Sequence, residues 1–239
     1  MRGSGRSRRR EPDTLDLIRR RIVACRRCPE LRAYCAKIAR EKKRSHAAEE
    51  YWGKPVPAFG DSRARLVLVG LAPGAHGSNR TGRMFTGDAS GEFLYAALHR
   101  AGFASQSNAT HDRDGMTLRD CTITAALRCA PPQNKPTPQE LRRCFPFLLD
   151  ELDALVRLRV AVGLGKIGYD ALVRAMRDRG FSFEERPQFG HGSEMTARKD
   201  GRVVHLLGCY HPSRQNTNTG KLTAAMFDAV LRRARTLLR

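Results

Sequence analysis

Four short apolar runs stand out along the chain, and longer segments with apolar residues at every third or fourth position lie between them. The runs are not strictly alternating, which is typical of parallel strands buried on both faces; they cover residues 66–69, 122–126, 160–162 and 203–207. Helical spacing occurs at residues 90–101, 138–158, 166–179 and 219–238, and in pieces from 13 to about 44. Strands that alternate with helices predict an α/β fold, here a three-layer α/β/α sandwich with a central, mainly parallel four-stranded sheet.

The organisation of the chain is simple. No internal repeat and no linker divides it, so residues 13–239 are predicted to form a single domain, as the length of 239 residues allows. Residues 1–12 contain Arg, Ser and Gly without an apolar anchor and are predicted to be a disordered basic tail.

The charge indicates the class of partner. Lys and Arg number 44 against 24 Asp and Glu, which gives a formal net charge of +20. A polyanion, by default nucleic acid, is the expected partner, although an arginine-rich proteome would give the same composition. No apolar run approaches the roughly 18 residues that a membrane span needs. The basic N-terminus is not followed by an apolar signal region, so the protein is expected in the cytoplasm, associated with the nucleoid. It is also expected to be a monomer.

Ligands of parallel sheets bind at the carboxyl ends of the strands, which directs attention to two loops. Residues 70–83 are rich in glycine, which lets a backbone approach a ligand closely, and they also carry polar side chains. Neither a P-loop ending nor a dinucleotide fingerprint is present in this loop. In the loop 210–223, His211 directly follows a strand and Pro212 restricts it. A capping loop that merely starts the last helix would be the alternative interpretation.

The seven cysteines suggest a cofactor rather than disulfides, because their number is odd and no secretory signal precedes them. Cys25 and Cys28 form one close pair, and Cys129 and Cys144 are separated by 14 residues that include four prolines. That gap is too long for a second zinc knuckle and suits a loop around an iron–sulfur cluster. Buried free thiols, the alternative, suit the other three cysteines better.

Four motifs, in this order, resemble the uracil-DNA glycosylase superfamily. They are Leu68-Val-Gly-Leu-Ala-Pro-Gly74, Asn79-Arg-Thr-Gly-Arg-Met-Phe-Thr-Gly87, Arg128-Cys-Ala-Pro-Pro132 and His211-Pro-Ser213. The cysteine pattern is similar to that of the iron–sulfur branches of the superfamily. The resemblance covers about residues 24–235 and is strongest to family 5, the type B enzymes, with family 4 as the runner-up.

The resemblance implies an enzyme that flips a deaminated base, uracil and also hypoxanthine or other damaged bases, out of double-stranded DNA and hydrolyses its N-glycosidic bond, leaving an abasic site. It implies a structural [4Fe-4S] cluster held by Cys25, Cys28, Cys129 and Cys144. The base pocket would be formed by Gly70, Leu71, Ala72, Pro73 and Gly74, with Phe85 stacking on the base and His76 nearby. His211 would lie near the base oxygen and the sugar.

Three departures from other branches of the superfamily, two of them from family 4, bear on the chemistry. An acidic residue of family 4 is replaced by Leu71, the Asp or Asn of other branches by Ala72, and the uracil-reading Asn by Ala125. These changes match the type B pattern and remove the obvious water-activating base. The alternatives are a family 4-like strict uracil glycosylase, a non-catalytic iron–sulfur nucleic-acid-binding protein, and an enzyme of free nucleotides.

Roles can be assigned to the remaining polar residues. His211, with backbone amides of residues 72–74, is expected to stabilise the negative charge of the leaving base. Asn79 or Asp88 could position the water, although Asp88 also fits the N-cap of the following helix. Contacts with DNA, mainly through phosphates, are predicted for Arg80, Arg83, Ser213, Arg214 and Lys221.

Overall fold

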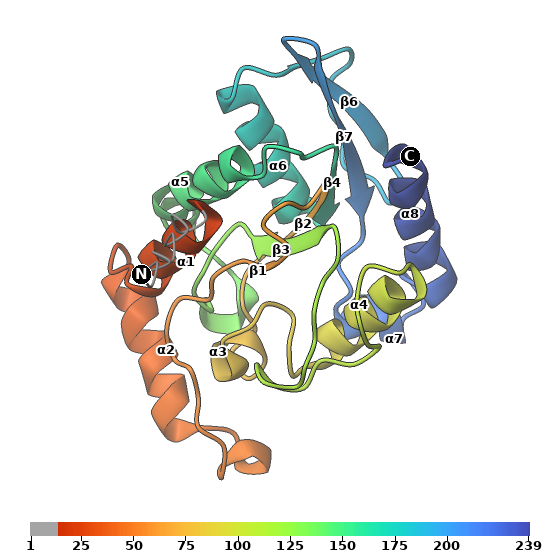
Figure 1. Cartoon of the computed structure of the whole chain (residues 1–239). Coiled ribbons are helices and arrows are strands. Elements are labelled where there is room, and N and C mark those ends of the chain that lie inside the picture. Colours follow the sequence, from red (N-terminus) through yellow and green to blue (C-terminus); the bar gives the residue numbers. More distant parts are fainter. Residues whose placement is uncertain (1–13) are drawn as a thin grey trace, which may run out of the picture.

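A computed structural model describes residues 14–239, so the tail predicted for residues 1–12 lies outside the described part (Figure 1). One sheet of seven strands has the order β1-β3-β2-β4-β7-β6-β5. The four predicted runs are its central strands, which pair in parallel: β3 (Cys121–Ala125), β2 (Leu66–Gly70), β4 (Val160–Leu164) and β7 (Arg202–Cys209).

The prediction of four strands was wrong in number, because three antiparallel strands extend the sheet at its edges: β1 (Phe59–Gly60), β5 (Ser182–Phe183) and β6 (Glu194–Lys199). Strand β6 has mostly charged and polar residues, and only Ala197 is buried. Such a strand contributes little apolar surface and gives no hydrophobic run. The other two strands contain two residues each, too few to leave a pattern.

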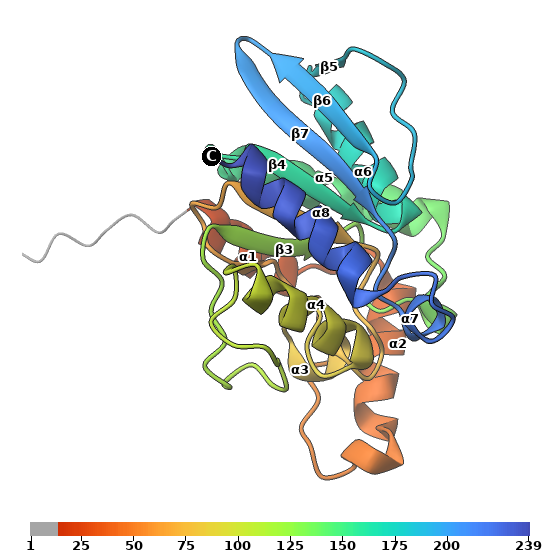
Figure 2. The ribbon, with the colours of Figure 1, turned by 90° about the vertical axis from the view of Figure 1, so that its right-hand side faces the viewer.

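Helices cover both faces of the sheet, as the three-layer prediction required (Figures 1 and 2). Alternate residues of β2 point to opposite faces. Leu66 and Leu68 pack in one core with α4 (Ala89–Arg100) and α8 (Ala224–Leu237). The second core contains Val67 and Val69 from the same strand. It is closed by α1 (Thr14–Val23), α5 (Pro138–Ala154) and α6 (Lys166–Asp178).

Short helical turns follow three of the parallel strands at their carboxyl ends. They are α3 (Ser78–Thr81) after β2, the 3₁₀ turn η2 (Pro132–Asn134) after β3, and α7 (Arg214–Asn218) after β7. Helix α2 (Pro29–Glu41) and the 3₁₀ turn η1 (Arg44–His46) extend away from the layers as an arm, residues 29–46 (Figures 1 and 2). Within residues 14–239, no helix is long and apolar enough to cross a membrane.

Candidate active site

A pocket of about 490 Å³ opens at the carboxyl ends of the parallel strands. The loops after β2, β3 and β7 all contribute to its wall, as expected for a sheet of this type. Several residues that the sequence pointed to line this pocket: Leu71, Ala72, Gly74, Phe85, Asp88, His211 and Ser213.

His211 is held in place through its backbone. The backbone N–H of Ser213 and the side-chain amide of Asn216 both donate to its carbonyl oxygen at 2.8 Å. Burial lowers the pKa of the imidazole to about 4, so the ring is neutral at pH 7. Across residues 14–239, neither ring nitrogen has a hydrogen-bond partner. The neutral ring therefore has one N–H free to donate to a carbonyl oxygen in the pocket.

Phe85 lies beside His211, with 5.8 Å between the ring centroids. Its backbone has a φ of +52°, a left-handed conformation that is uncommon for an aromatic residue. The ring lies against Gly70, where a Cβ atom would come within 2.7 Å of the phenyl carbon Cζ. Because Gly70 has no Cβ atom, it leaves room for the phenyl ring of Phe85. Neither Gly70 nor Pro73 lines the pocket itself, in contrast to the prediction.

Asp88 caps a helix and also borders the pocket. One carboxylate oxygen accepts from the backbone N–H of Gly91 at 3.0 Å and caps α4. The other lies against Gly74 and Gly77, and a Cβ atom on Gly77 would be only 2.0 Å away from it. Burial raises the pKa of the carboxyl. The same side chain borders the pocket, so capping does not remove it from the site.

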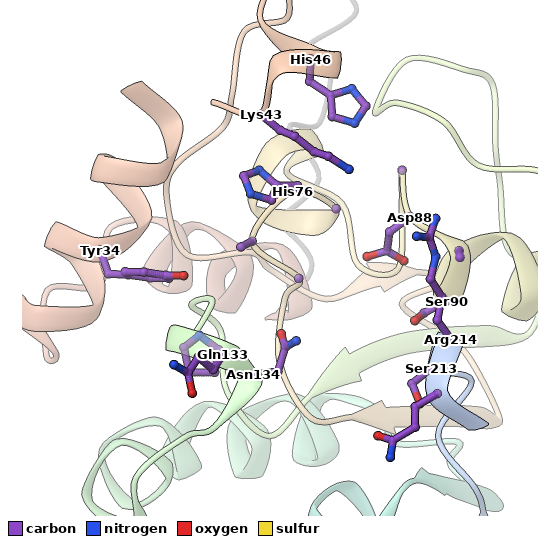
Figure 3. Close-up of a pocket in the computed structure, with 17 residues that line it drawn as sticks. Tyr34, Lys43, His46, His76, Asp88, Ser90, Gln133, Asn134, Ser213 and Arg214 are labelled. Carbon is purple, nitrogen blue, oxygen red and sulfur yellow. The ribbon is translucent and has the colours of Figure 1, made fainter. Parts of the chain in front are cut away.

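A second cavity of about 600 Å³ adjoins the first and shares part of its wall, including Asp88 (Figure 3). His76 lines this second cavity and not the predicted base pocket. Its Nδ1 atom is 3.1 Å from the hydroxyl of Tyr51. Burial and the charge of Lys43 lower its pKa.

The structure contradicts the prediction that Asn79 positions a water molecule. Its side chain is fully buried and lines neither cavity. The amide is oriented toward the carbonyl oxygens of Cys35 and Ala75, both at 3.4 Å. The sequence did not show that residues 78–81 form a helical turn, which directs this side chain inward.

Arg80 and Arg83 are also not available for DNA, because both side chains are buried and paired. Arg80 forms an ion pair with Glu49 and donates to the carbonyl oxygen of Gly87 at 2.7 Å. Arg83 makes two hydrogen bonds to the carboxylate of Asp114, at 2.8 and 2.6 Å. Both guanidinium groups are buried and each is already paired with a carboxylate, so neither is placed to contact a phosphate of bound DNA. Arg214 and Lys221 are exposed, and their contact with DNA stays a prediction.

Pocket residues that the sequence did not reveal include Gln133 and Asn134, which lie in η2. Both have a positive φ, +54° and +57°, which only asparagine of the two tolerates readily. They belong to the segment between Cys129 and Cys144, which was interpreted only as a wrap around a cofactor. The sequence signal that could have identified these two residues is the position of their segment at the carboxyl end of a parallel strand. The other lining residues missed were Ser78, Ser90, Lys135 and Gln215.

The four predicted metal ligands, Cys25, Cys28, Cys129 and Cys144, come together around one small cavity. The wall also contains four arginines, Arg27, Arg32, Arg128 and Arg143. No three His, Cys, Asp or Glu within residues 14–239 are arranged to hold a single metal ion. Four thiols spread around a common space, with guanidinium groups beside them, suit an anionic cluster ligated by thiolates better than a single zinc ion.

A buried ion pair connects the loop that contains Cys129 to the helix that contains Cys144. Arg128, which precedes Cys129, lies 2.6 Å from the carboxylate of Glu151 on α5, the helix that also contains Cys144. Both side chains are almost completely buried. The hydroxyl of Thr124 donates to the same carboxylate at 2.6 Å. The loop after β3 is thereby fixed to α5 without any cofactor.

Comparison with known proteins identifies the class to which this fold and pocket belong. Residues 57–235 match the model of the uracil DNA glycosylase superfamily, so the chain is a member of that family. A type-5 uracil-DNA glycosylase of Thermus thermophilus is 50% identical, over 90% of this chain and 94% of the relative. In Pyrobaculum aerophilum, a type-5 enzyme is 42% identical over 90% of this chain and 89% of its own length. A type-4 enzyme of that organism is 32% identical over 77% and 80%.

Proposed function

We propose that this protein is a DNA-repair enzyme that flips uracil out of duplex DNA and hydrolyses its N-glycosidic bond, leaving an abasic site. The similarity to type-5 uracil-DNA glycosylases over nine-tenths of the chain supports this activity. The observation that carries the chemistry is the unpaired, neutral imidazole of His211 beside the ring of Phe85. The enzyme acts as a monomer on the DNA of the cytoplasm, at the nucleoid.

The mechanism follows from what the reaction demands. When the bond between base and sugar breaks, negative charge develops on the base and positive charge on the sugar. A donor aimed at the base oxygen stabilises the first, and the phosphates of the DNA itself stabilise the second. In our proposal His211 donates its N–H to the base oxygen while Phe85 stacks on the flipped base. Asp88 orients the water from the edge of the pocket.

Hypoxanthine is proposed as a second substrate. Leu71 and Ala72 contribute no polar side chain to the pocket. The amide side chains of Gln133 and Asn134, which also line it, can hydrogen-bond to either base because an amide both donates and accepts. A pocket of about 490 Å³ leaves room for a bicyclic purine as well as for uracil. The lower identity to type-4 enzymes argues against the alternative of a strict uracil glycosylase of that type.

The cysteine cavity is proposed to hold a [4Fe-4S] cluster with Cys25, Cys28, Cys129 and Cys144 as ligands. When bound, the cluster would cross-link the segment before α2, the loop after β3 and helix α5. Metal analysis after anaerobic purification should give four irons per chain, and one zinc without iron would refute the proposal. Replacing Cys209, a buried cysteine outside this cavity, by Ala should leave the iron content unchanged.

The activity is tested with duplexes that contain one uracil or one hypoxanthine, followed by alkali, which cleaves DNA at abasic sites. The expected result is cleavage of the uracil strand, with slower cleavage of the hypoxanthine strand. A non-catalytic DNA-binding protein would shift both duplexes in a gel and leave both strands intact. An enzyme of free nucleotides would release uracil from deoxyuridine monophosphate and leave the duplex unchanged.

A further inference from the structure

The second cavity, next to the base pocket, has a basic wall with no role in the mechanism above. Lys43, His46, His76 and Arg214 contribute to it, and among the described residues that line it the single carboxylate is that of Asp88 (Figure 3). Lys43 comes from the η1 end of the arm and Arg214 from α7, so the cations belong to elements far apart in the sequence. A cavity bordered by cations from two elements fits an anionic ligand.

The two strong cations of this cavity lack carboxylate partners. No ion pair of Lys43 or Arg214 occurs within residues 14–239, and both residues are exposed. The nearby Arg80 and Arg83, in contrast, are each paired with a carboxylate. An unpaired cation that faces a cavity keeps its full charge available for an anion from outside.

The arm that presents Lys43 is fixed to the rest of the protein. Glu49, just after η1, forms an ion pair with Arg80, and its carboxylate lies within hydrogen-bond distance of Nδ1 of His46, at 2.6 Å. Farther along, the backbone N–H of Trp52 donates to the carbonyl oxygen of Arg80 at 2.8 Å. Residues 29–46 also precede the segment matched by the family model, residues 57–235. The arm is thus fixed in place at the edge of the second cavity, and it lies outside the segment that the family model matches.

We infer that this cavity binds the sugar-phosphate backbone of the target strand immediately beside the flipped nucleotide, with Lys43 and Arg214 contacting phosphates from opposite sides. The inference rests on the proposed function, because the shared wall places this cavity next to the base pocket. A flipped nucleotide in one cavity brings the neighbouring phosphates to the other. His76, whose pKa is lowered, contributes a neutral donor and not a third charge.

The test measures how affinity depends on salt, because each phosphate contact releases counterions. The probe is a duplex with one 2′-fluoro-deoxyuridine, which resists hydrolysis. Relative to wild type, Lys43→Gln should reduce the slope of log affinity against log salt by about 0.9, and Lys43→Gln with Arg214→Gln by about twice that. The matched control is Lys199→Gln, which removes one charge at the far end of β6 and should leave the slope unchanged.

A second measurement locates the contact. Neutral methylphosphonates replace single phosphates around the uracil one at a time. One position beside the uracil should weaken binding of the wild type and have no further effect on Lys43→Gln. If Lys43→Gln and Lys199→Gln change the slope equally, or if no position distinguishes wild type from Lys43→Gln, the inference is wrong. Excision of ordinary uracil by the wild type tests the proposed function separately.

Discussion

Two halves of one loop, residues 70–77 and residues 78–83, behave in opposite ways. The first half is mostly glycine and small apolar residues, and it borders both cavities. The second half carries the amide and the two guanidinium groups that suggest chemistry, and these three side chains are buried. They hold the loop and the arm in position, through Glu49, Asp114 and the carbonyl oxygen of Cys35.

The difference teaches that polar character alone does not identify a functional side chain. In residues 70–77 the absence of side chains matters, because glycines at positions 70, 74 and 77 leave space for Phe85 and Asp88. In residues 78–83 the two guanidinium groups and the side-chain N–H group of Asn79 have partners elsewhere in the chain, and those partners decide their role. A charged group that is paired inside the protein supports the site, whereas an unpaired one can act on a ligand.

The strongest test of this distinction is His211, whose ring has no partner. His211→Ala should lower single-turnover excision of uracil by about 10²-fold or more, because one donor to the developing charge is lost. Binding of the uracil duplex should hardly change, since the contact strengthens only in the transition state. Rapid-quench kinetics at saturating enzyme would measure the rate, and a titration with a non-hydrolysable duplex the affinity.

The control for that variant is His205→Ala on β7, the strand that precedes His211. His205 lies 3.9 Å from Glu194, away from the pocket, and its replacement should keep nearly the full rate. If His211→Ala retains the rate of wild type, stabilisation of the leaving base by this residue is excluded.

Arg83 tests the other half of the loop. Arg83→Ala leaves Asp114 buried without its partner, and loss of one member of a buried ion pair typically costs about 3–5 kcal/mol. The free energy of unfolding, measured by denaturant titration, should fall by about that amount. The salt dependence of DNA binding by the folded fraction should stay the same. Arg113→Ala, an exposed neighbour, serves as the control and should change neither quantity.

The fold was largely predictable because its four central strands are buried on both faces. Continuous apolar runs marked them, and the intervening helical patterns fixed the layers. The edge strands were not predictable for the opposite reason. Strand β6 needs only Ala197 in the core, so its sequence is that of a solvated surface. Strands β1 and β5 are defined by their partners and not by their own residues.

The site was predictable where position relative to a strand determines it. Leu71, Ala72 and His211, which follow strands, border the pocket, and so does Phe85, which only the family resemblance pointed to. It was not predictable for Gln133 and Asn134, because a left-handed backbone depends on the tertiary structure around η2. For Asn79, Arg80 and Arg83, burial of the side chain decides whether it can reach a ligand. The sequence of a polar loop does not show which of its side chains are buried.

The partly buried, neutral state of the His211 ring also predicts how stability depends on pH. Its pKa is about 4 in the folded protein and 6.5 when exposed, so between these values the unfolded chain binds more protons. Stability therefore rises with pH through this window, is complete above about pH 7, and is lost as the pH falls toward 4. From pH 7 to pH 5 the wild type should lose about 1–2 kcal/mol more than His211→Gln. Equal losses in denaturant titrations at both pH values would show that burial does not keep the imidazole neutral.

The smallest expected effect concerns Asp88, which belongs to both categories because it caps α4 and borders the pocket. Asp88→Ala removes the cap and should lower the free energy of unfolding by about 1 kcal/mol. Asp88→Asn keeps an oxygen for the backbone N–H of Gly91 and should retain nearly the full stability. The two variants therefore separate capping from chemistry. If Asp88→Asn is as stable as wild type but slower in excision, the carboxylate orients the water, as the proposed mechanism requires. The excision rate of Asp88→Asn should fall less than that of His211→Ala. If Asp88→Asn excises uracil at the full rate while Asp88→Ala is only less stable, the residue is a cap alone, and the water is held by another group of the pocket.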